Sequence, residues 1–182
     1  MLEYRTSCGG TIRVLPKTVE HLKAHPEVTV FLNEAIGLLS LPRRPAKLES
    51  VIDLGKAIGR SNLLPTPAVA YDEAAMFAMR HGRRSASRVV EPNNVGPTCS
   101  TIVVIAKPTP IPETYDLLTS WIGKLACKEP WDLSIRSEEE RNKCLAFWRS
   151  HALIHDSKTM SKMFQSSWQK ILSESREPCV RI

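Results

Sequence analysis

Apolar and polar residues alternate in some stretches of the chain and recur at helical spacing in others. Thr11–Leu15 alternates after two glycines and stops at Pro16, which predicts a first strand. A short helix is predicted to begin at Thr18, a suitable N-cap residue. Apolar residues at every third or fourth position predict a buried amphipathic helix over 27–40, and Pro26 suits its first turn.

The middle of the chain carries mainly strand patterns. Val51–Leu54 predicts a strand that bends at the glycines after it. Residues 73–80 and 87–90 predict two strands joined by an arginine-rich turn. Ser100–Lys107 is a β-branched run that indicates burial on both faces. Tyr115–Ile122 alternates, and we expect it to pair antiparallel with that run.

Helical spacing returns in the C-terminal part of the chain. Ser137–Glu140 has the sequence of a capping box and predicts a helix that extends to about His155. Further apolar residues predict a last helix between Met160 and Leu172.

This order of elements predicts an α+β fold. We expect an antiparallel sheet of four to six strands, with the N-terminal helices packed on one face and the C-terminal helices added. We expect residues 1–182 to form a single domain, with an α+β core at 11–123 and a helical extension at 124–182.

The composition excludes several classes of protein. The 182 residues are 42% hydrophobic and 24% charged, which is typical of a soluble globular protein. The N-terminus lacks the apolar core of a signal peptide and no apolar run has the length of a membrane helix, so we expect a cytoplasmic protein without membrane association. The five cysteines form no CxxC pair, and the sequences of phosphate-binding loops and nucleophile elbows are missing. We therefore expect no metal and no cofactor.

The net charge of +6 is concentrated in one segment. Residues 76–107 hold five basic residues and one acidic residue, Glu91, a surplus of +4. Such a surplus favours a polyanionic partner such as RNA or DNA. The alternative is that arginines at a hairpin tip only keep a sheet edge in solution. The basic residues are Arg80, Arg83, Arg84, Arg88 and Lys107.

Two pairs of histidines have helical spacing. His21 and His25 are four residues apart, which places both rings on one face of the predicted helix. Such a pair suits general acid–base catalysis, a metal ion, or a solvent-facing or capping role. His151 and His155 form a second pair. His151 lies among apolar residues and suits a core position, or a rival catalytic base if it faces the sheet.

Other polar residues on the predicted strands suit phosphate binding. Arg60 follows a glycine in the bent strand, where its planar guanidinium either reaches a phosphate or is an ordinary surface group. Thr101 and Thr119 are expected to be near neighbours in the hairpin. Each threonine either serves only to favour the strand conformation or donates a hydrogen bond to a phosphate oxygen.

Arg88 alternates with Ser87 and Val89 on its predicted strand. If Val89 points to the core, Arg88 points outward together with Arg80 or Arg84. The hairpin would then present a cationic face.

These residues together resemble a known group of nucleases. The strand at Thr11, the helix with His21 and His25, the strand with Gly59-Arg60-Ser61, the strand Ser87–Val90 and the 100–122 hairpin occur in this order. Over about residues 11–123 the chain resembles the barnase–EndoU–colicin–RelE-like nuclease superfamily, most of all its phage- and toxin-associated branches. The resemblance implies a four- to five-stranded antiparallel sheet with helices on one face, and metal-independent cleavage of RNA through attack by the ribose 2′-hydroxyl.

The resemblance also implies roles for single residues. His21 or His25 would be the acid–base group, Arg60 and Arg88 would bind the scissile phosphate, and Thr101 or Thr119 would contact it. Tyr115 or Trp121 would stack a base, with Arg80, Arg83 and Arg84 adding to the nucleic-acid-binding face. RNA is the expected partner, and an inhibitor or antitoxin protein is a further one.

Three functions therefore follow from the sequence. The first is a toxin-type endoribonuclease, and the second is a non-catalytic module that binds RNA, DNA or protein through a basic hairpin. The third is a structural or phage-related interaction protein whose arginines only solvate a sheet edge. Residues 124–182 lie outside the resemblance. They would form an inhibitory or partner-binding element, or they belong to a branch of the superfamily that has lost catalysis.

Overall fold

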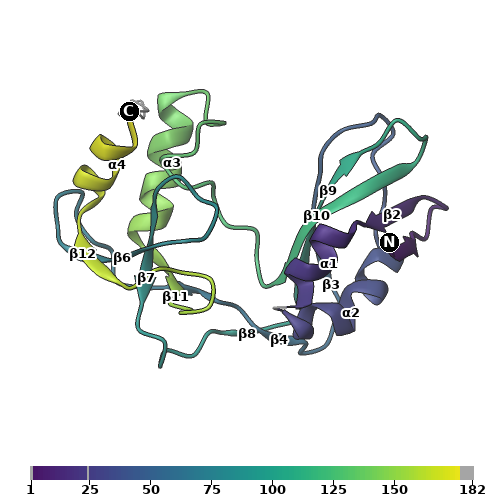
Figure 1. Ribbon diagram of the computed structural model, residues 1–182, viewed down its shortest axis with the longest axis horizontal. Coiled ribbons are helices and arrows are strands. Elements are labelled where there is room, and N and C mark those ends of the chain that lie inside the picture. Colours follow the sequence, from purple (N-terminus) through teal and green to yellow (C-terminus); the bar gives the residue numbers. More distant parts are fainter. Residues whose placement is uncertain (1, 24, 177–182) are drawn as a thin grey trace. The chain divides into compact units, whose positions relative to one another are not determined.

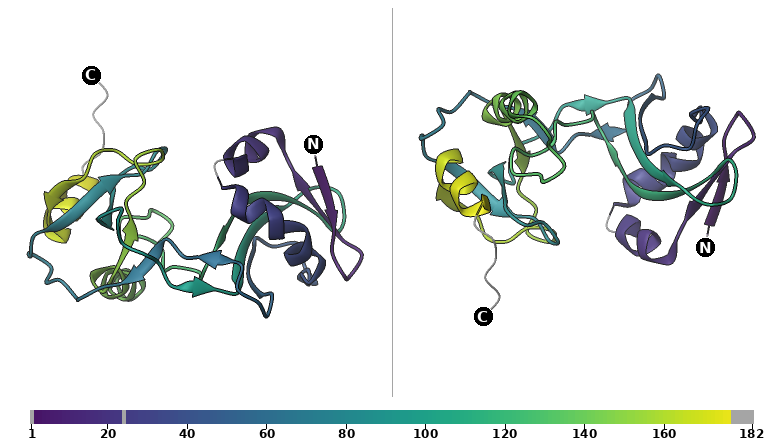
Figure 2. Two further views of the ribbon diagram at one scale, coloured as in Figure 1. Left: turned by 90° about the horizontal axis from the view of Figure 1, so that it is seen from below. Right: turned by 90° about the horizontal axis from the view of Figure 1, so that it is seen from above.

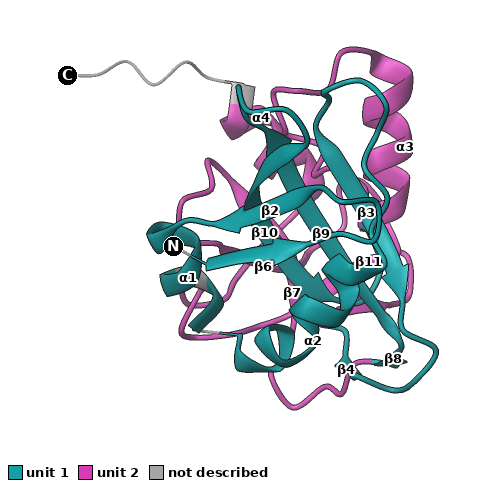
Figure 3. Cartoon of the chain, turned by 90° about the vertical axis from the view of Figure 1, so that its right-hand side faces the viewer, with its two compact units in different colours: residues 1–61, 97–125 teal, residues 62–96, 126–182 magenta. Residues whose placement is uncertain are grey.

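A computed structural model describes residues 2–23 and 25–176. The chain divides into two compact units, each made of two segments of the sequence (Figure 3). Unit 1 comprises residues 1–61 and 97–125, and unit 2 comprises residues 62–96 and 126–182. The sequence suggested a core at 11–123, but residues 62–96 belong to unit 2, because their strands pair with strands from the C-terminal segment.

The α+β class predicted from the sequence is confirmed. The described residues form four helices and two five-stranded sheets, together with one small two-stranded sheet (Figure 1). None of the helices in this described part has both the length and the apolar composition needed to cross a bilayer.

The sheet of unit 1 has one parallel pair and three antiparallel pairs. The predicted hairpin at 100–122 is present as β9 and β10, with a bulge between Leu117 and Thr119. The first strand of the chain was missed by the sequence analysis. In sheet order the strands are β1 (Leu2–Arg5), β2 (Thr11–Val14), β10 (Thr114–Ile122), β9 (Thr101–Pro108) and β3 (Leu48–Asp53).

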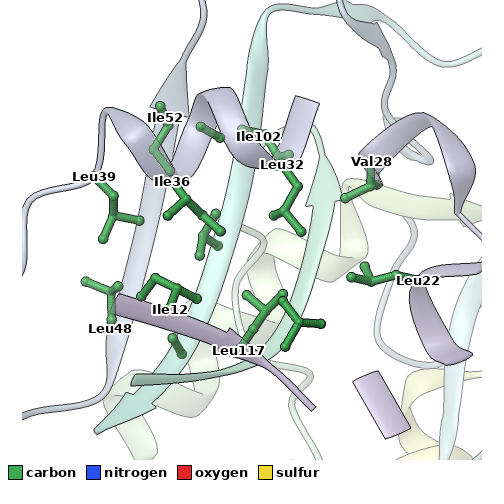
Figure 4. Close-up of a cluster of buried hydrophobic side chains, with 14 of the residues drawn as sticks. Ile12, Leu22, Val28, Leu32, Ile36, Leu39, Leu48, Ile52, Ile102 and Leu117 are labelled. Carbon is green, nitrogen blue, oxygen red and sulfur yellow. The ribbon is translucent and has the colours of Figure 1, made fainter. Parts of the chain in front are cut away.

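Two helices, α1 (Pro16–Lys23) and α2 (Pro26–Gly37), cover one face of this sheet (Figure 2). Pro26 occupies the first turn of α2, as the sequence predicted, because its fixed φ suits that position and its missing N–H costs no helical hydrogen bond. Leu32 and Ile36 of α2 are fully buried against Ile12 and Ile102 of the sheet (Figure 4). An apolar core of this kind forms wherever a helix stripe meets a sheet face.

A small sheet completes unit 1. It consists of β4 (Gly59–Arg60) and β8 (Thr98–Cys99), paired antiparallel. A Cβ atom at Gly59 would lie 2.7 Å from Ile122 Cδ1, so a larger residue at this position would require the Ile122 side chain to shift.

The second five-stranded sheet belongs to unit 2. The predicted hairpin of residues 73–80 and 87–90 is present as β6 and β7, which pair antiparallel. In sheet order the strands are β12 (Phe164–Ser166), β6 (Ala75–Met79), β7 (Ala86–Val90), β11 (His151–Ile154) and β5 (Leu63–Pro65).

The helices of unit 2 are α3 (Glu138–Arg149) and α4 (Trp168–Arg176). Each contributes a tryptophan to an apolar cluster with the sheet, and the Trp168 ring meets the Phe77 ring edge-on at 5.1 Å. The predicted N-cap is confirmed, since the Ser137 hydroxyl accepts a hydrogen bond from Glu140 N at 3.0 Å.

Both predicted C-terminal helices have different bounds from those expected. The first ends at Arg149 instead of His155, because residues 151–154 form β11 and pair with β5 and β7. The second begins at Trp168 instead of Met160, because residues 164–166 pair with β6. Pairing between distant strands overrides the local helical spacing in both places.

Candidate nucleic-acid interface

The turn between β6 and β7 carries exposed basic side chains. Arg83 N donates a hydrogen bond to Arg80 O at 3.0 Å, and Gly82 has a φ of +75°, a left-handed conformation that glycine adopts without strain. The side chains of His81, Arg83 and Arg84 are exposed. The turn therefore exposes two arginines and a histidine to solvent.

A segment from the C-terminal part of unit 2 runs along the base of this turn. His81 N donates to Thr159 O at 3.0 Å, and Ser161 N donates to Met79 O at 2.8 Å. These bonds bring a second set of basic side chains to the turn.

Lys158 and Lys162 lie at the two ends of that segment, and both are exposed. Together with the basic side chains of the turn they form a local concentration of positive charge. The two backbone segments that carry these side chains are joined by hydrogen bonds. We call this concentration the basic hairpin surface; it consists of His81, Arg83, Arg84, Lys158 and Lys162.

A buried ion pair fixes the base of the turn. The Glu129 side chain is only 4% exposed, and its Oε2 lies 2.6 Å from Arg80 Nη2. The Ser87 hydroxyl donates to the other carboxylate oxygen and accepts a hydrogen bond from Arg80 Nε at 3.0 Å. Burial raises the pKa of Glu129, while Arg80 and Ser87 act to lower it. Arg80, predicted to bind nucleic acid, is therefore engaged inside the unit.

Three carboxylates lie near the basic hairpin surface, and each has a polar partner of its own. Asp156 accepts hydrogen bonds from Lys158 N and the Thr159 hydroxyl. Glu174 lines a small pocket beside Arg84, with its carboxylate 4.0 Å from Lys170 Nζ.

The third carboxylate, Asp132, accepts a hydrogen bond from Ser134 N at 2.8 Å. Burial acts to raise its pKa, but hydrogen bonds from Ser134 and the charges of Lys128 and Arg83 lower it overall. Asp132 is therefore kept ionised beside Arg83, and its negative charge offsets part of the positive charge of the basic hairpin surface.

Arg88 does not lie on the outward face that the alternation predicted. It is 6% exposed, and its guanidinium donates to Arg149 O at 2.5 Å and to Pro67 O at 3.2 Å. Burial lowers its pKa, with Glu73 acting in the opposite direction. β7 is a central strand covered on both faces, so alternation along it does not separate buried from exposed positions.

The remaining candidates from the sequence belong to unit 1. His21 lies in α1, and its side chain is outside the described part of the structure. His25 stands between α1 and α2, half-buried, with Nδ1 3.5 Å from Glu27 Oε1. Arg60 is exposed on β4, opposite Thr98.

The β10 candidates lie on both faces of the unit 1 sheet. Tyr115 is 4% exposed and belongs to the helix-facing core, so it offers no surface for stacking a base. Thr119 and Trp121 alternate with the core-facing Ile122, which places them on the helix-free face, and both are half-buried. Trp121 Nε1 donates to Lys124 O at 3.2 Å.

Thr101 and Thr119 are not direct partners across the hairpin. Thr119 pairs with Ile105, whereas Thr101 pairs with Asp53 of β3 and its hydroxyl donates to Gly123 O at 2.8 Å. The catalytic set inferred from the resemblance is thus divided: Arg88 belongs to unit 2, and the two histidines, Arg60 and Thr119 belong to unit 1.

The second histidine pair does not share a helical face. His151 is on β11, where its ring stacks on Phe147 at 4.0 Å and Nδ1 contacts Phe147 O at 2.9 Å. His155 Nε2 contacts Ser161 O at 2.8 Å. Both rings are held by local packing and backbone oxygens.

Sequence reasoning missed four residues of this interface: His81, Glu129, Lys158 and Lys162. Glu129 is 42 residues from Ser87 and 49 from Arg80, and no local pattern marks a buried carboxylate. The two lysines share a helical spacing of four, but their position beside the turn depends on long-range pairing.

The chain was also compared with known proteins. No family model, no curated protein and no solved structure matches it. The geometry itself is that of a surface suited to anions: guanidinium and ammonium groups on a fixed turn contact phosphates without reading sequence.

Proposed function

We propose that this protein binds RNA through the basic hairpin surface of unit 2. The observation that carries the proposal is the convergence of Arg83, Arg84, Lys158 and Lys162 from two hydrogen-bonded segments. RNA is named as the polyanion on the strength of the nuclease resemblance over about residues 11–123.

The buried ion pair gives this surface its rigidity. Because Glu129 holds Arg80 at the base of the turn, the neighbouring arginines are presented from a fixed backbone. A preorganised cationic turn loses less conformational freedom on binding than a flexible tail does. The basic hairpin surface therefore suits a phosphate chain better than scattered surface charge does.

The test is fluorescence anisotropy of a labelled single-stranded RNA. The double variant R83Q/R84Q is expected to bind about tenfold or more weakly, because hydrogen bonds to charged groups contribute roughly 1.5–3 kcal/mol each. The matched control is R43Q/R44Q, which removes an exposed adjacent arginine pair from unit 1. An equal loss of RNA affinity in both variants would show that only the net charge of the protein matters, and it would overturn the proposal.

A second candidate function is cleavage of the bound RNA by unit 1. It is favoured by unit 1, in which α1 and α2 cover one face of a mostly antiparallel five-stranded sheet, although the Ser87–Val90 strand of the resemblance belongs to unit 2. His21 or His25 would supply the acid–base group. Thr119 lies on the helix-free face, across the sheet from the helices, and so is not part of this site.

Labelled RNA incubated with the protein in EDTA tests this second candidate. The expected result is cleavage that H25A or a His21→Ala variant lowers at least 100-fold, the size of general acid–base effects. Cleavage that both variants retain, or no cleavage by the unaltered protein, excludes it while leaving the binding proposal standing.

A further inference from the structure

A pocket of about 650 Å³ lies in unit 2, apart from the basic hairpin surface. It is bounded by the loop at Tyr71, the N-terminal half of α3 and Leu172 of α4. Its volume is within the range of pockets that hold small ligands, roughly 300–1,000 Å³. None of its lining residues belongs to the basic hairpin surface.

Two arginines, one on α3 and one just before it, line this pocket. Arg136 and Arg141 both line it, and the described residues place no carboxylate within ion-pair distance of either guanidinium. Arg141 is held in place by Pro130 O, which accepts from its Nη1 at 2.8 Å. A pair of unneutralised guanidinium groups on one pocket suits a single phosphate, which accepts forked hydrogen bonds.

The first turn of α3 contributes little attraction for an anion, because it carries three glutamates. Glu140 is occupied, accepting from Lys128 Nζ at 2.9 Å and from Arg136 N at 3.2 Å. Glu138 lines the pocket and is the acceptor that remains there. An anion in this pocket would therefore meet the two guanidinium groups and not the helix end.

The other wall of the pocket is aromatic and apolar. Tyr71 is 41% exposed, and Leu145 and Leu172 line the same space. A flat ring gains free energy by covering such side chains. Glu138 and Asn142 supply an acceptor and an amide for hydroxyl and amino groups of the same ligand.

We propose that this pocket binds a nucleoside monophosphate. The phosphate lies between Arg136 and Arg141, and the base lies against Tyr71, with Glu138 and Asn142 meeting the sugar and the base edge. An aromatic carboxylic acid without hydroxyl or amino groups would leave Glu138 and Asn142 without partners. A nucleotide has a partner for these two residues as well as for the arginines and Tyr71. This site goes beyond the proposed RNA-binding surface and does not depend on it.

The test is calorimetric titration of the full chain with adenosine 5′-monophosphate. We expect saturable one-to-one binding, with adenosine and inorganic phosphate each binding at least tenfold more weakly. R136Q is expected to weaken binding about tenfold, since it removes hydrogen bonds to a charged group. Y71A is expected to weaken the binding of the monophosphate but not that of phosphate.

Two control variants remove positive charge outside the pocket. K143Q changes an exposed cation on the same helix that does not line the pocket, and it should bind as the unaltered protein does. R83Q/R84Q should also retain full affinity for the monophosphate. No binding at millimolar concentration, or equal binding by R136Q and the unaltered protein, would overturn the assignment whatever the outcome for RNA.

Discussion

Unit 1 and unit 2 place charge differently around their sheets. In unit 1 the face of the sheet that packs against the helices is apolar. The ion pair of this unit joins Arg13 of β2, whose side chain is 22% exposed, to Asp116 of β10, whose side chain is 11% exposed. In unit 2 the central strands bury Arg88 and, through Ser87, contact the carboxylate of Glu129. The comparison teaches that both units combine an apolar core with buried polar groups, but unit 2 buries the charged side chains of Arg88 and Glu129, whereas the charged pair of unit 1 is partly exposed at Arg13.

The largest expected effect is that of Glu129→Ala in unit 2. The variant leaves Arg80 and Ser87 without their buried acceptor, and breaking a buried pair in this way costs about 3–5 kcal/mol. Urea unfolding of the full chain measures the loss. Glu34→Ala is the control, because its exposed pair with Lys56 contributes at most about 1 kcal/mol. Equal losses would contradict the difference drawn between the units.

The apolar core of unit 1 should respond to loss of volume. Leu32→Ala removes a fully buried side chain from α2 and is expected to cost about 2–5 kcal/mol, as for similar core truncations. Val30→Ala on the same helix changes a side chain that is 73% exposed and should stay within about 0.5 kcal/mol. Thermal or urea unfolding distinguishes them, and similar losses would show that α2 does not bury the predicted face.

A smaller effect concerns pH and the carboxylate of Glu129. Its pKa in the folded state is raised, chiefly by burial, so the folded state holds the proton more tightly than the unfolded state does. Stability from this group is therefore fully present below its unfolded pKa, near 4.3, and is lost as pH rises through the folded pKa. The loss is about 1.4 kcal/mol for each unit by which the pKa is raised.

Glu129→Gln isolates this contribution, because the amide does not titrate. As pH rises from 4 to 7, the free energy of unfolding of the unaltered protein should fall relative to that of E129Q. The opposite trend would mean that the attraction of Arg80 outweighs desolvation and lowers the pKa of Glu129.

Local patterns were enough to predict much of unit 1. The spacing in α2 and the β-branched run in β9 are properties of contiguous residues, and the structure confirms both elements. The same reasoning predicted the β6–β7 hairpin and the Ser137 N-cap in unit 2.

Long-range partners account for what could not be predicted. The alternation in β7 predicted that Arg88 is exposed, but its guanidinium is buried and donates to the backbone oxygens of Pro67 and Arg149. Residues 151–154 have helical spacing but pair with two strands distant in sequence. Among the candidate site residues, Arg83 and Arg84 are exposed as expected, whereas the position of Lys158 and Lys162 required the structure.

The salt dependence of RNA binding tests the central claim most directly. The slope of log affinity against log salt counts the phosphates that the protein neutralises, at about 0.7 per contact for a single strand. If Arg83 and Arg84 contact phosphates, the slope for R83Q/R84Q should be shallower than that of the unaltered protein by roughly 1.4, while R43Q/R44Q keeps the full slope. Unchanged slopes in R83Q/R84Q, or absence of RNA binding at low salt, would contradict binding through the basic hairpin surface.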